Sequence, residues 1–277
     1  MSVSRFANAN GLKLHYLDYG NGDAPALVCI HGLTGNAHNF DAVAPHLRHA
    51  YRVVSLDVRG RGDSQWGPPE NYTYSQYASD LASFLDALDI RRVSLLGTSM
   101  GGIISMIYAA SHSQRIERVV LNDIGPEFDL AGVERILDSV SEAPREFRDL
   151  DEVAAYYRAA YPPLADAPVQ SLLGFCRWAV REGENGRQVW KTDPAVRRVR
   201  PTGPSSVLPD LWAMYRRITA PVLVIRGAES DLLSPATTQR MRAAHAKTRV
   251  VEVPGAGHAP FLTEPEALAA LKEFFAC

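Results

Sequence analysis

A serine in this chain lies in a setting where its hydroxyl could act as a nucleophile. Ser99 sits in the stretch Gly97-Thr-Ser-Met-Gly101, after the apolar run Val93–Leu96 and before a helix-compatible segment. A strand, an abrupt turn and a helix around G-x-S-x-G lift a serine hydroxyl clear of the backbone. The flanking glycines have no Cβ, so strand and helix can approach closely. The stretch therefore predicts Ser99 as a catalytic nucleophile.

A serine hydroxyl needs a base to take its proton at neutral pH. His258 lies in Pro254-Gly-Ala-Gly-His258-Ala-Pro260, directly after the last predicted strand. It is therefore expected at the same carboxyl edge of a parallel sheet as Ser99, where open α/β sheets carry their sites. We predict His258 as the base. The other histidines, apart from His31, fit surface or packing positions: His15, His38, His46, His49, His112 and His245.

A third group, an acid, is expected to orient the base. Asp231 follows the apolar run Pro221–Ile225 and precedes His258 in the chain, so it is the predicted acid. Glu229 is two residues closer to that strand, and Asp123 ends the strand after the elbow helix. Both remain alternatives, although Asp123 also fits a turn before Gly125-Pro126.

Acyl transfer also requires two donors for a developing oxyanion. The N–H of Met100, next to the nucleophile, is one candidate. The dipeptide His31-Gly32 ends a buried strand and places the N–H of Leu33 as the other. In this interpretation His31 and Gly32 are supporting residues that shape the loop. Asp57 and Arg59 are expected to brace it, unless they form only a surface ion pair of little energetic value.

The elements that would position these residues alternate between strands and helices. A hairpin is predicted at Arg5–Ala7 and Leu12–Tyr19. Further strands are predicted at Ala26–Ile30, Tyr51–Leu56, Val93–Leu96, 116–121, 221–225 and 249–253. Helices are predicted between them at 39–47, 74–88, 102–110 and 235–246, and after the last strand at 264–275. This rhythm favours βαβ crossovers and a mostly parallel sheet.

The rhythm changes between residues 125 and 217. Short helical stretches are interrupted there by Pro-Pro, Gly and Asp-Pro, and no strand is convincing. We interpret residues 125–217 as an inserted helical lid on a core domain formed by residues 1–124 and 218–277. About a third of its aromatic side chains are expected to line an apolar pocket: Phe128, Tyr156, Tyr157, Phe175, Trp178, Trp190, Trp212 and Tyr215.

The composition is that of an ordinary globular protein. Of the 277 residues, 46% are hydrophobic and 22% charged, and the formal net charge of −2 gives no basic surface for nucleic acid. Three cysteines at unrelated spacings suggest neither disulfides nor a metal site. No apolar signal core or membrane-spanning run is evident. We expect a cytoplasmic monomer or homodimer that needs no cofactor, metal, nucleic acid or membrane.

Taken together, these motifs resemble those of the α/β-hydrolase family, nearly from end to end. They occur in the family's order: His31-Gly32, Asp57-x-Arg59-Gly60-x-Gly62-x-Ser64, Gly97-x-Ser99-x-Gly101-Gly102, Asp231 and Gly257-His258. The resemblance implies an eight-stranded, mostly parallel sheet flanked by helices, with a cap after the sixth strand. It also implies the roles of nucleophile, acid and base for Ser99, Asp231 and His258, and of oxyanion donors for Leu33 and Met100.

Departures from other members narrow the expected chemistry. Serine at the elbow disfavours epoxide hydrolases and haloalkane dehalogenases, which use aspartate there. The short His31-Gly32-Leu33 loop differs from that of lipases accepting bulky alcohols, and from the His-Gly-Ser/Ala-Gly-Pro-Gly loop of C–C hydrolases. We expect a serine hydrolase acting on a small or medium carboxylic ester or a lactone. C–C hydrolysis of a diketone, perhydrolysis and slow, receptor-like ligand binding remain alternatives.

Overall fold

A computed structural model describes residues 2–161, 164, 168–198 and 208–276. Its main feature is an eight-stranded sheet in the order β1-β2-β4-β3-β5-β6-β10-β11. The strands are β1 Val3–Ala9, β2 Leu12–Asp18, β3 Ala26–Ile30, β4 Arg52–Leu56, β5 Val93–Thr98, β6 Ile116–Asn122, β10 Val222–Gly227 and β11 Thr248–Val253. Strand β2 pairs antiparallel with both β1 and β4, and the other pairs of neighbouring strands are parallel. The predicted eight-stranded, mostly parallel sheet is confirmed.

Local sequence explains the strands. Strands β3 and β10 are buried along their whole length, which matches their continuous apolar runs. The opening hairpin turns at Asn10-Gly11, where both residues have positive φ, 46° and 75°. A two-residue turn with positive φ at both positions matches the right-handed twist of the paired strands.

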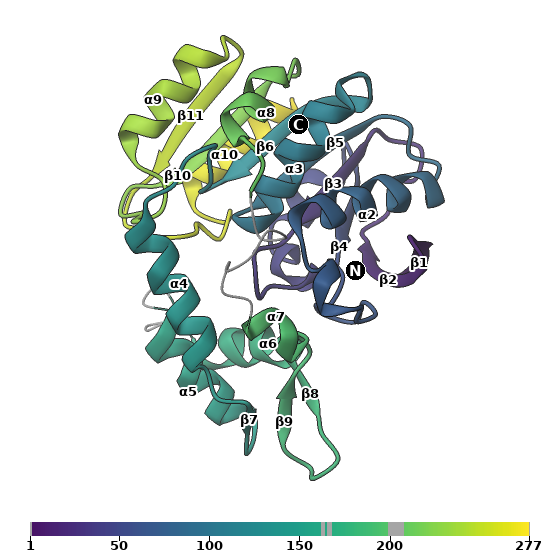
Figure 1. Ribbon diagram of the computed structural model, residues 1–277, viewed down its shortest axis with the longest axis vertical. Helices are drawn as coiled ribbons and strands as arrows, with labels where there is room; N and C mark the ends of the chain where they lie inside the picture. The colour runs from purple at the N-terminus through teal and green to yellow at the C-terminus, as the bar shows by residue number, and fades with distance from the viewer. Residues whose placement is uncertain (1, 162–163, 165–167, 199–207, 277) are drawn as a thin grey trace.

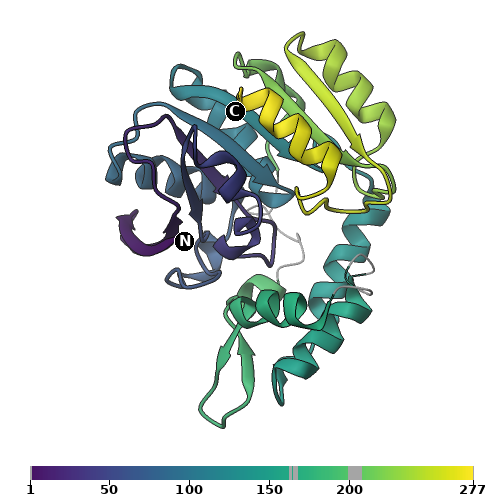
Figure 2. The same ribbon diagram turned by 180° about the vertical axis from the view of Figure 1, so that it is seen from behind.

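Helices cover both faces of the sheet (Figures 1 and 2). The helices α2 Tyr74–Ala87, α3 Met100–Ser111, α8 Leu211–Arg217 and α9 Pro235–Ala244 share one core cluster with the sheet. The helices α1 Ala44–Leu47 and α10 Pro265–Phe275 share a second cluster on the opposite face. The helix expected at 39–47 is split into a 3-10 turn, Ala37–Phe40, and α1. Pro45 has no N–H and cannot continue a helix from the preceding turn.

Residues 125–217 leave the sheet after β6 and return to it at β10. Their elements are α4 Leu130–Glu142, β7 Glu146–Phe147, α5 Leu150–Ala160, α6 Val169–Ala179, β8 Val180–Glu182, β9 Gln188–Trp190, α7 Pro194–Arg198 and α8. In Figure 1, α4 to α7 extend away from the sheet, whereas α8 lies against α3 in the core. We call this segment the insertion.

Two expectations about the insertion are corrected. It contains a small antiparallel sheet, β7-β9-β8, whose short strands carry too few residues to show a period in the sequence. The helix α8 packs as part of the core, because Tyr215 is buried in the main cluster and not in the insertion's own. Within the described residues, no helix is both long and apolar enough to cross a bilayer.

Candidate active site

Ser99 occupies the turn between β5 and α3, as predicted. Its backbone has φ 51° and ψ −115°, a conformation that a non-glycine residue adopts only under strain. Its N–H donates to the carbonyl of Asn122 at 3.0 Å, which ties the turn to β6. A Cβ on Gly97 would collide with the backbone of Gly101, and a Cβ on Gly101 with that of Ile30. Only glycine fits at both positions, so the sequence dictates this turn.

His258 lies beside Ser99, also as predicted. Its Nε2 is 3.0 Å from Ser99 Oγ, and its Nδ1 is 2.7 Å from Asp123 Oδ2. Because the Asp123 carboxylate can only accept, Nδ1 carries the proton and Nε2 is left to accept from the serine hydroxyl. The three side chains thus form one hydrogen-bonded chain that can carry the Ser99 proton to the imidazole.

The predicted acid, Asp231, does not contact His258, and this prediction is corrected in favour of the alternative, Asp123. Asp231 instead forms a two-point ion pair with Arg135 of α4, with contacts of 2.5 and 2.8 Å. Residues 228–233 form turns and bends after β10, and the N–H of Ser230 donates back to the carbonyl of Gly227 at 3.0 Å. This turn directs Ser230 inward, where its hydroxyl donates to Asp123 at 2.6 Å, and leaves Asp231 exposed. Glu229, the other alternative, is exposed.

The carboxylate of Asp123 accepts hydrogen bonds from other groups besides His258. It is fully buried, and its Oδ1 accepts from the N–H of Gly227 at 2.8 Å. With Ser230 and His258, it therefore accepts from three donors at the ends of β10 and β11. The preceding residue, Asn122, donates to Thr98 Oγ1 at 3.1 Å and to the carbonyl of Pro260 at 2.9 Å. This amide links the strands of Ser99 and Asp123 to the loop of His258.

The loop after β3 lies next to the nucleophile. A methyl group on Gly32 would contact Ser99 Cβ at 3.7 Å. His31 joins this loop to the loop after β4. Its Nδ1 donates to the carbonyl of Gly32 at 2.7 Å, and its Nε2 accepts from the N–H of Val58 at 3.0 Å. Burial lowers the pKa of His31 to about 4, so the ring is neutral in this role. Among the hydrogen bonds of the described residues, none uses the Leu33 or Met100 N–H.

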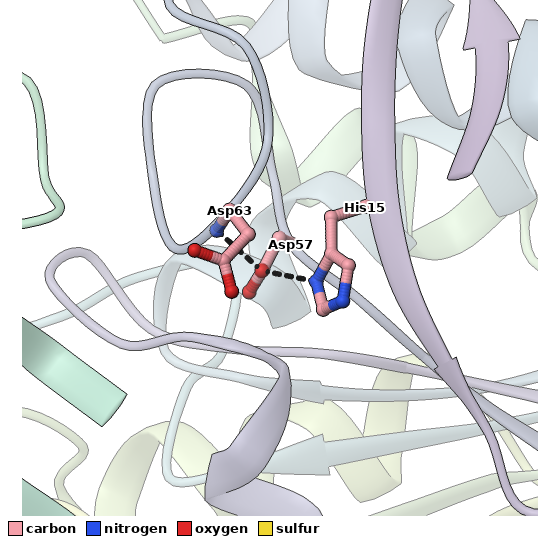
Figure 3. A group of neighbouring side chains, drawn as sticks. All are labelled: His15, Asp57 and Asp63. Carbon is pink, nitrogen blue, oxygen red and sulfur yellow. Dashed lines mark hydrogen bonds and ion pairs between the residues drawn. The ribbon is translucent and has the colours of Figure 1, made fainter. Parts of the chain in front are cut away.

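A second polar cluster stabilises the adjoining loop after β4. Figure 3 shows Asp57 between His15 and Asp63. The Asp57 carboxylate accepts from His15 Nδ1 at 2.7 Å and from the N–H groups of Asp63 and Ala37 at 2.8 and 2.6 Å. Burial acts to raise the pKa of Asp57, but the hydrogen bond from His15, the interactions with the His31 and His15 rings and the hydrogen bond from the Asp63 N–H together hold it below its ordinary value.

This cluster is a structural brace. Acidic and histidine side chains of this kind could hold a cation, and their ligand atoms lie within 4.8 Å of one another. Hydrogen bonds already occupy both oxygens of Asp57, however, and the Asp63 carboxylate pairs with Lys191 at 2.7 Å. Arg59, expected to act with Asp57, instead pairs with Asp80 through contacts of 2.5 and 2.7 Å.

Ser99 opens into a largely apolar cavity of about 210 Å³. It lies between the core and the insertion and is lined by Leu33, Arg61, Tyr72, Thr73, Tyr74, Tyr77, Ser99, Met100, Ile103, Ile124, Phe128, Val133, Ile136, Leu137, Val196, Leu208 and Leu232. A larger hollow of about 540 Å³ between α5 and α6 is lined by no serine, cysteine or histidine of the described residues. The cavity at Ser99 is therefore the candidate substrate site.

The aromatic side chains of this cavity differ from those expected. Of the aromatics named from the sequence, Phe128 lines the cavity in the described chain. Most of the others belong to a cluster within the insertion or, for Tyr215, to the main core. The aromatics that the sequence missed, Tyr72, Tyr74 and Tyr77, come from the loop and helix after β4. For Tyr77, the sequence showed only the helical spacing that is typical of a core residue.

Comparisons with known proteins identify similar proteins over nearly the whole chain. The chain is 36% identical to 3-hydroxybutyrate-oligomer hydrolase of Cupriavidus necator, covering 95% of this chain and 92% of that protein. It is 27% identical to 2-(acetamidomethylene)succinate hydrolase of Mesorhizobium japonicum, covering 95% and 91%. The crystal structure of an alpha/beta hydrolase from Novosphingobium aromaticivorans superimposes with a TM-score of 0.88 at 34% identity, covering 99% and 98%. Residues 27–271 match the alpha/beta hydrolase family as a whole, and the chain belongs to that family.

Proposed function

We propose that this protein is a cofactor-free serine hydrolase that cleaves a small or medium carboxylic ester or a lactone. The hydrogen-bonded chain Ser99–His258–Asp123 at the wall of a cavity carries this proposal. A strained, half-buried serine at the cavity wall, with a base at 3.0 Å and a buried carboxylate behind the base, matches the requirements for acyl transfer.

In the first half of the reaction, Ser99 Oγ attacks the ester carbonyl carbon while His258 Nε2 takes the hydroxyl proton. The N–H groups of Met100 and Leu33 stabilise the negative charge that develops on the carbonyl oxygen. Because α3 begins at Met100, its N-terminal partial positive charge adds to this stabilisation. His258 then gives its proton to the departing alcohol, and an acyl-enzyme remains on Ser99.

In the second half, His258 takes a proton from a water molecule that attacks the acyl carbon. The tetrahedral intermediate expels Ser99 Oγ, which recovers the proton from His258, and the carboxylic acid leaves. In both halves the carboxylate of Asp123 keeps the proton of the neutral ring on Nδ1 and stabilises the imidazolium.

The cavity and the insertion set the size of the substrate. Ligand pockets for drug-sized molecules measure about 300–1,000 Å³, and a cavity of about 210 Å³ is smaller. Helix α4 contributes Val133, Ile136 and Leu137 to its wall. We therefore assign the insertion the role of a lid that excludes water and limits the acyl or alcohol group. The name of the relative from Cupriavidus necator supports an ester, because oligomers of a hydroxy acid are joined by ester bonds.

The test combines a fluorophosphonate probe with p-nitrophenyl esters of increasing acyl length. Labelling of Ser99, with a preference for short or medium acyl chains, is the expected result. The proposal fails if the wild-type protein neither reacts with the probe nor hydrolyses any ester or lactone. Labelling together with cleavage of diketones, but not of esters or lactones, would replace ester hydrolysis by C–C hydrolysis.

A further inference from the structure

A buried positive charge lines the cavity beside Ser99. Arg61, in the loop after β4, is 1% exposed. Its Nε donates to the carbonyl of Leu33 at 3.1 Å, and its Nη1 donates to the carbonyl of Arg59 and to Tyr77 Oη, both at 2.8 Å. All three acceptors are neutral. Within the described parts of the chain, no carboxylate forms an ion pair with Arg61.

A second buried arginine in the same loop, Arg59, does have a charged partner. Arg59 is equally inaccessible, at 3%, and it is neutralised by two contacts with Asp80. A buried charge without a charged partner is costly, because protein dipoles replace water incompletely. Arg59 therefore has a carboxylate partner. Arg61, two residues later, lines the substrate cavity with no such partner among the described residues.

Arg61 also retains hydrogen-bonding capacity. Its Nη2 carries two N–H groups, and among the described residues its one hydrogen-bonding contact is with Met100 Sδ at 3.4 Å, a weak acceptor. Tyr74 lines the same cavity, and none of the hydrogen bonds found in the described residues involves its hydroxyl. Burial raises the pKa of Tyr74 to about 12, so this hydroxyl is protonated and can donate.

We propose that the preferred substrate is an ester bearing a carboxylate, which Arg61 and Tyr74 bind beside Ser99. This inference rests on the proposed ester hydrolysis and names the class of ester. Arg61 touches Leu33 and Met100, the two residues whose N–H groups face the reacting carbonyl in that mechanism. The carboxylate therefore lies only a short chain away from the ester group. The apolar walls, including Ile103 and Ile136, enclose the rest of the molecule.

The experiment compares esters of similar size, one with a carboxylate and the other with an apolar group in its place. Monoethyl succinate and ethyl 4-methylpentanoate share the same chain, with a carboxylate at the end of one and an isopropyl group at the end of the other. The pair 3-acetoxypropanoate and 3-methylbutyl acetate places the same difference on the alcohol side. Rates are measured by titration of released acid at pH 7.5. We expect the wild-type protein to prefer the anionic member of at least one pair, by about 10- to 100-fold in kcat/KM.

Three variants test the assignment of the residues. Arg61→Met removes the charge and should abolish the preference, while the neutral ester reports any damage to the oxyanion loop. Tyr74→Phe removes one hydroxyl and should reduce the preference by a smaller factor. Arg92→Met is the matched control, because it removes an exposed arginine that is paired with Glu117, and it should keep the preference.

The outcomes separate the two proposals. If the wild-type protein cleaves neutral esters as well as their anionic partners in both pairs, the carboxylate assignment is wrong and ester hydrolysis stands. Equal losses on both members of a pair in Arg61→Met would make Arg61 a purely structural residue. Absence of turnover on every ester, together with absence of probe labelling at Ser99, would instead overturn ester hydrolysis itself.

Discussion

The Nδ1 atom of His258 and the Oδ2 atom of Asp123 lie 2.7 Å apart, although the two residues are 135 positions apart in the chain. Asp123 follows β6 and His258 follows β11, and β10 lies between these strands in the sheet. Asp123 reaches across the end of β10 because its backbone turns through a positive φ of 52°. The Gly227 N–H and the Ser230 hydroxyl donate hydrogen bonds to its carboxylate and hold it in this position.

The first prediction distinguishes the two aspartates. Asp123→Asn should lower kcat by about 10³- to 10⁴-fold, because an amide can hold the imidazole in the wrong tautomer and cannot stabilise the imidazolium. Asp231→Asn should change kcat by less than about threefold, since it removes only an exposed ion pair with Arg135 that contributes about 1 kcal/mol or less. Steady-state kinetics on the best ester, with circular dichroism as the check on folding, measures both.

The reverse pattern would overturn the assignment of the acid. A large loss in Asp231→Asn, with near-normal turnover in Asp123→Asn, would mean that the loop after β10 rearranges in solution. Arg135→Gln is a useful companion, because it breaks the same ion pair from the side of the insertion. It should match Asp231→Asn in both activity and stability.

The sequence was sufficient to predict the sheet and two of the three residues in the hydrogen-bonded chain. Ser99 and His258 are identified by glycine-containing turns directly after apolar strands, which place both residues at the carboxyl edge of the sheet. The two aspartates could not be ranked in the same way. Asp123 and Asp231 both follow strands that end at the same edge, and the choice depends on the conformation of the turn after β10, which directs Ser230 inward and leaves Asp231 exposed.

The cavity was predicted less well, because its walls come from segments distant in the chain. The aromatics of the insertion mostly pack on one another around Trp190, since a segment of this size needs a core of its own. Tyr74 and Tyr77 lie on a helix whose spacing indicates only that one face is buried. Arg61 lay within a recognised motif, but nothing in the sequence showed that its charge lacks a carboxylate partner.

The second prediction concerns the nucleophile. Ser99→Ala should reduce kcat/KM by about 10⁴-fold or more, and labelling by the fluorophosphonate probe should disappear. The fold should be unchanged, because the Ser99 hydroxyl contacts His258 and makes no other hydrogen bond among the described residues. Turnover assays with freshly purified variant, together with thermal unfolding, measure both effects. Normal turnover in this variant would remove Ser99 from the mechanism.

The third prediction concerns the closeness of β5 and α3. Gly97→Ala should lower the free energy of unfolding by about 2 kcal/mol or more, because the added methyl group meets rigid backbone at Gly101. Gly174→Ala is the matched control, since this helical glycine of α6 has no atom near its added Cβ. It should stabilise the protein by about 0.5–1 kcal/mol. Urea unfolding of the three proteins tests the contrast, and equal stability of both variants would contradict it.

The last prediction concerns the stability of the loop after β3 at acid pH. His31 has a pKa of about 4 in the folded protein, below the ordinary value of 6.5, because it is buried. Between these values the unfolded chain binds a proton that the folded protein does not, so stability falls as the pH is lowered from about 7 to about 4. The proton would also place an N–H on Nε2 against the N–H of Val58.

The expected size of this effect is about 3 kcal/mol at pH 4, from the difference between the two pKa values. Urea unfolding of the wild-type protein and of His31→Gln across this range isolates it, because the other titrating groups are common to both. The variant should lose less stability on acidification than the wild type, by about that amount. His49→Gln, which removes an exposed histidine, is the control and should follow the wild type. If His31→Gln also follows the wild type, His31 titrates alike in the folded and unfolded chains, and its proposed role as a neutral acceptor beneath Gly32 is wrong.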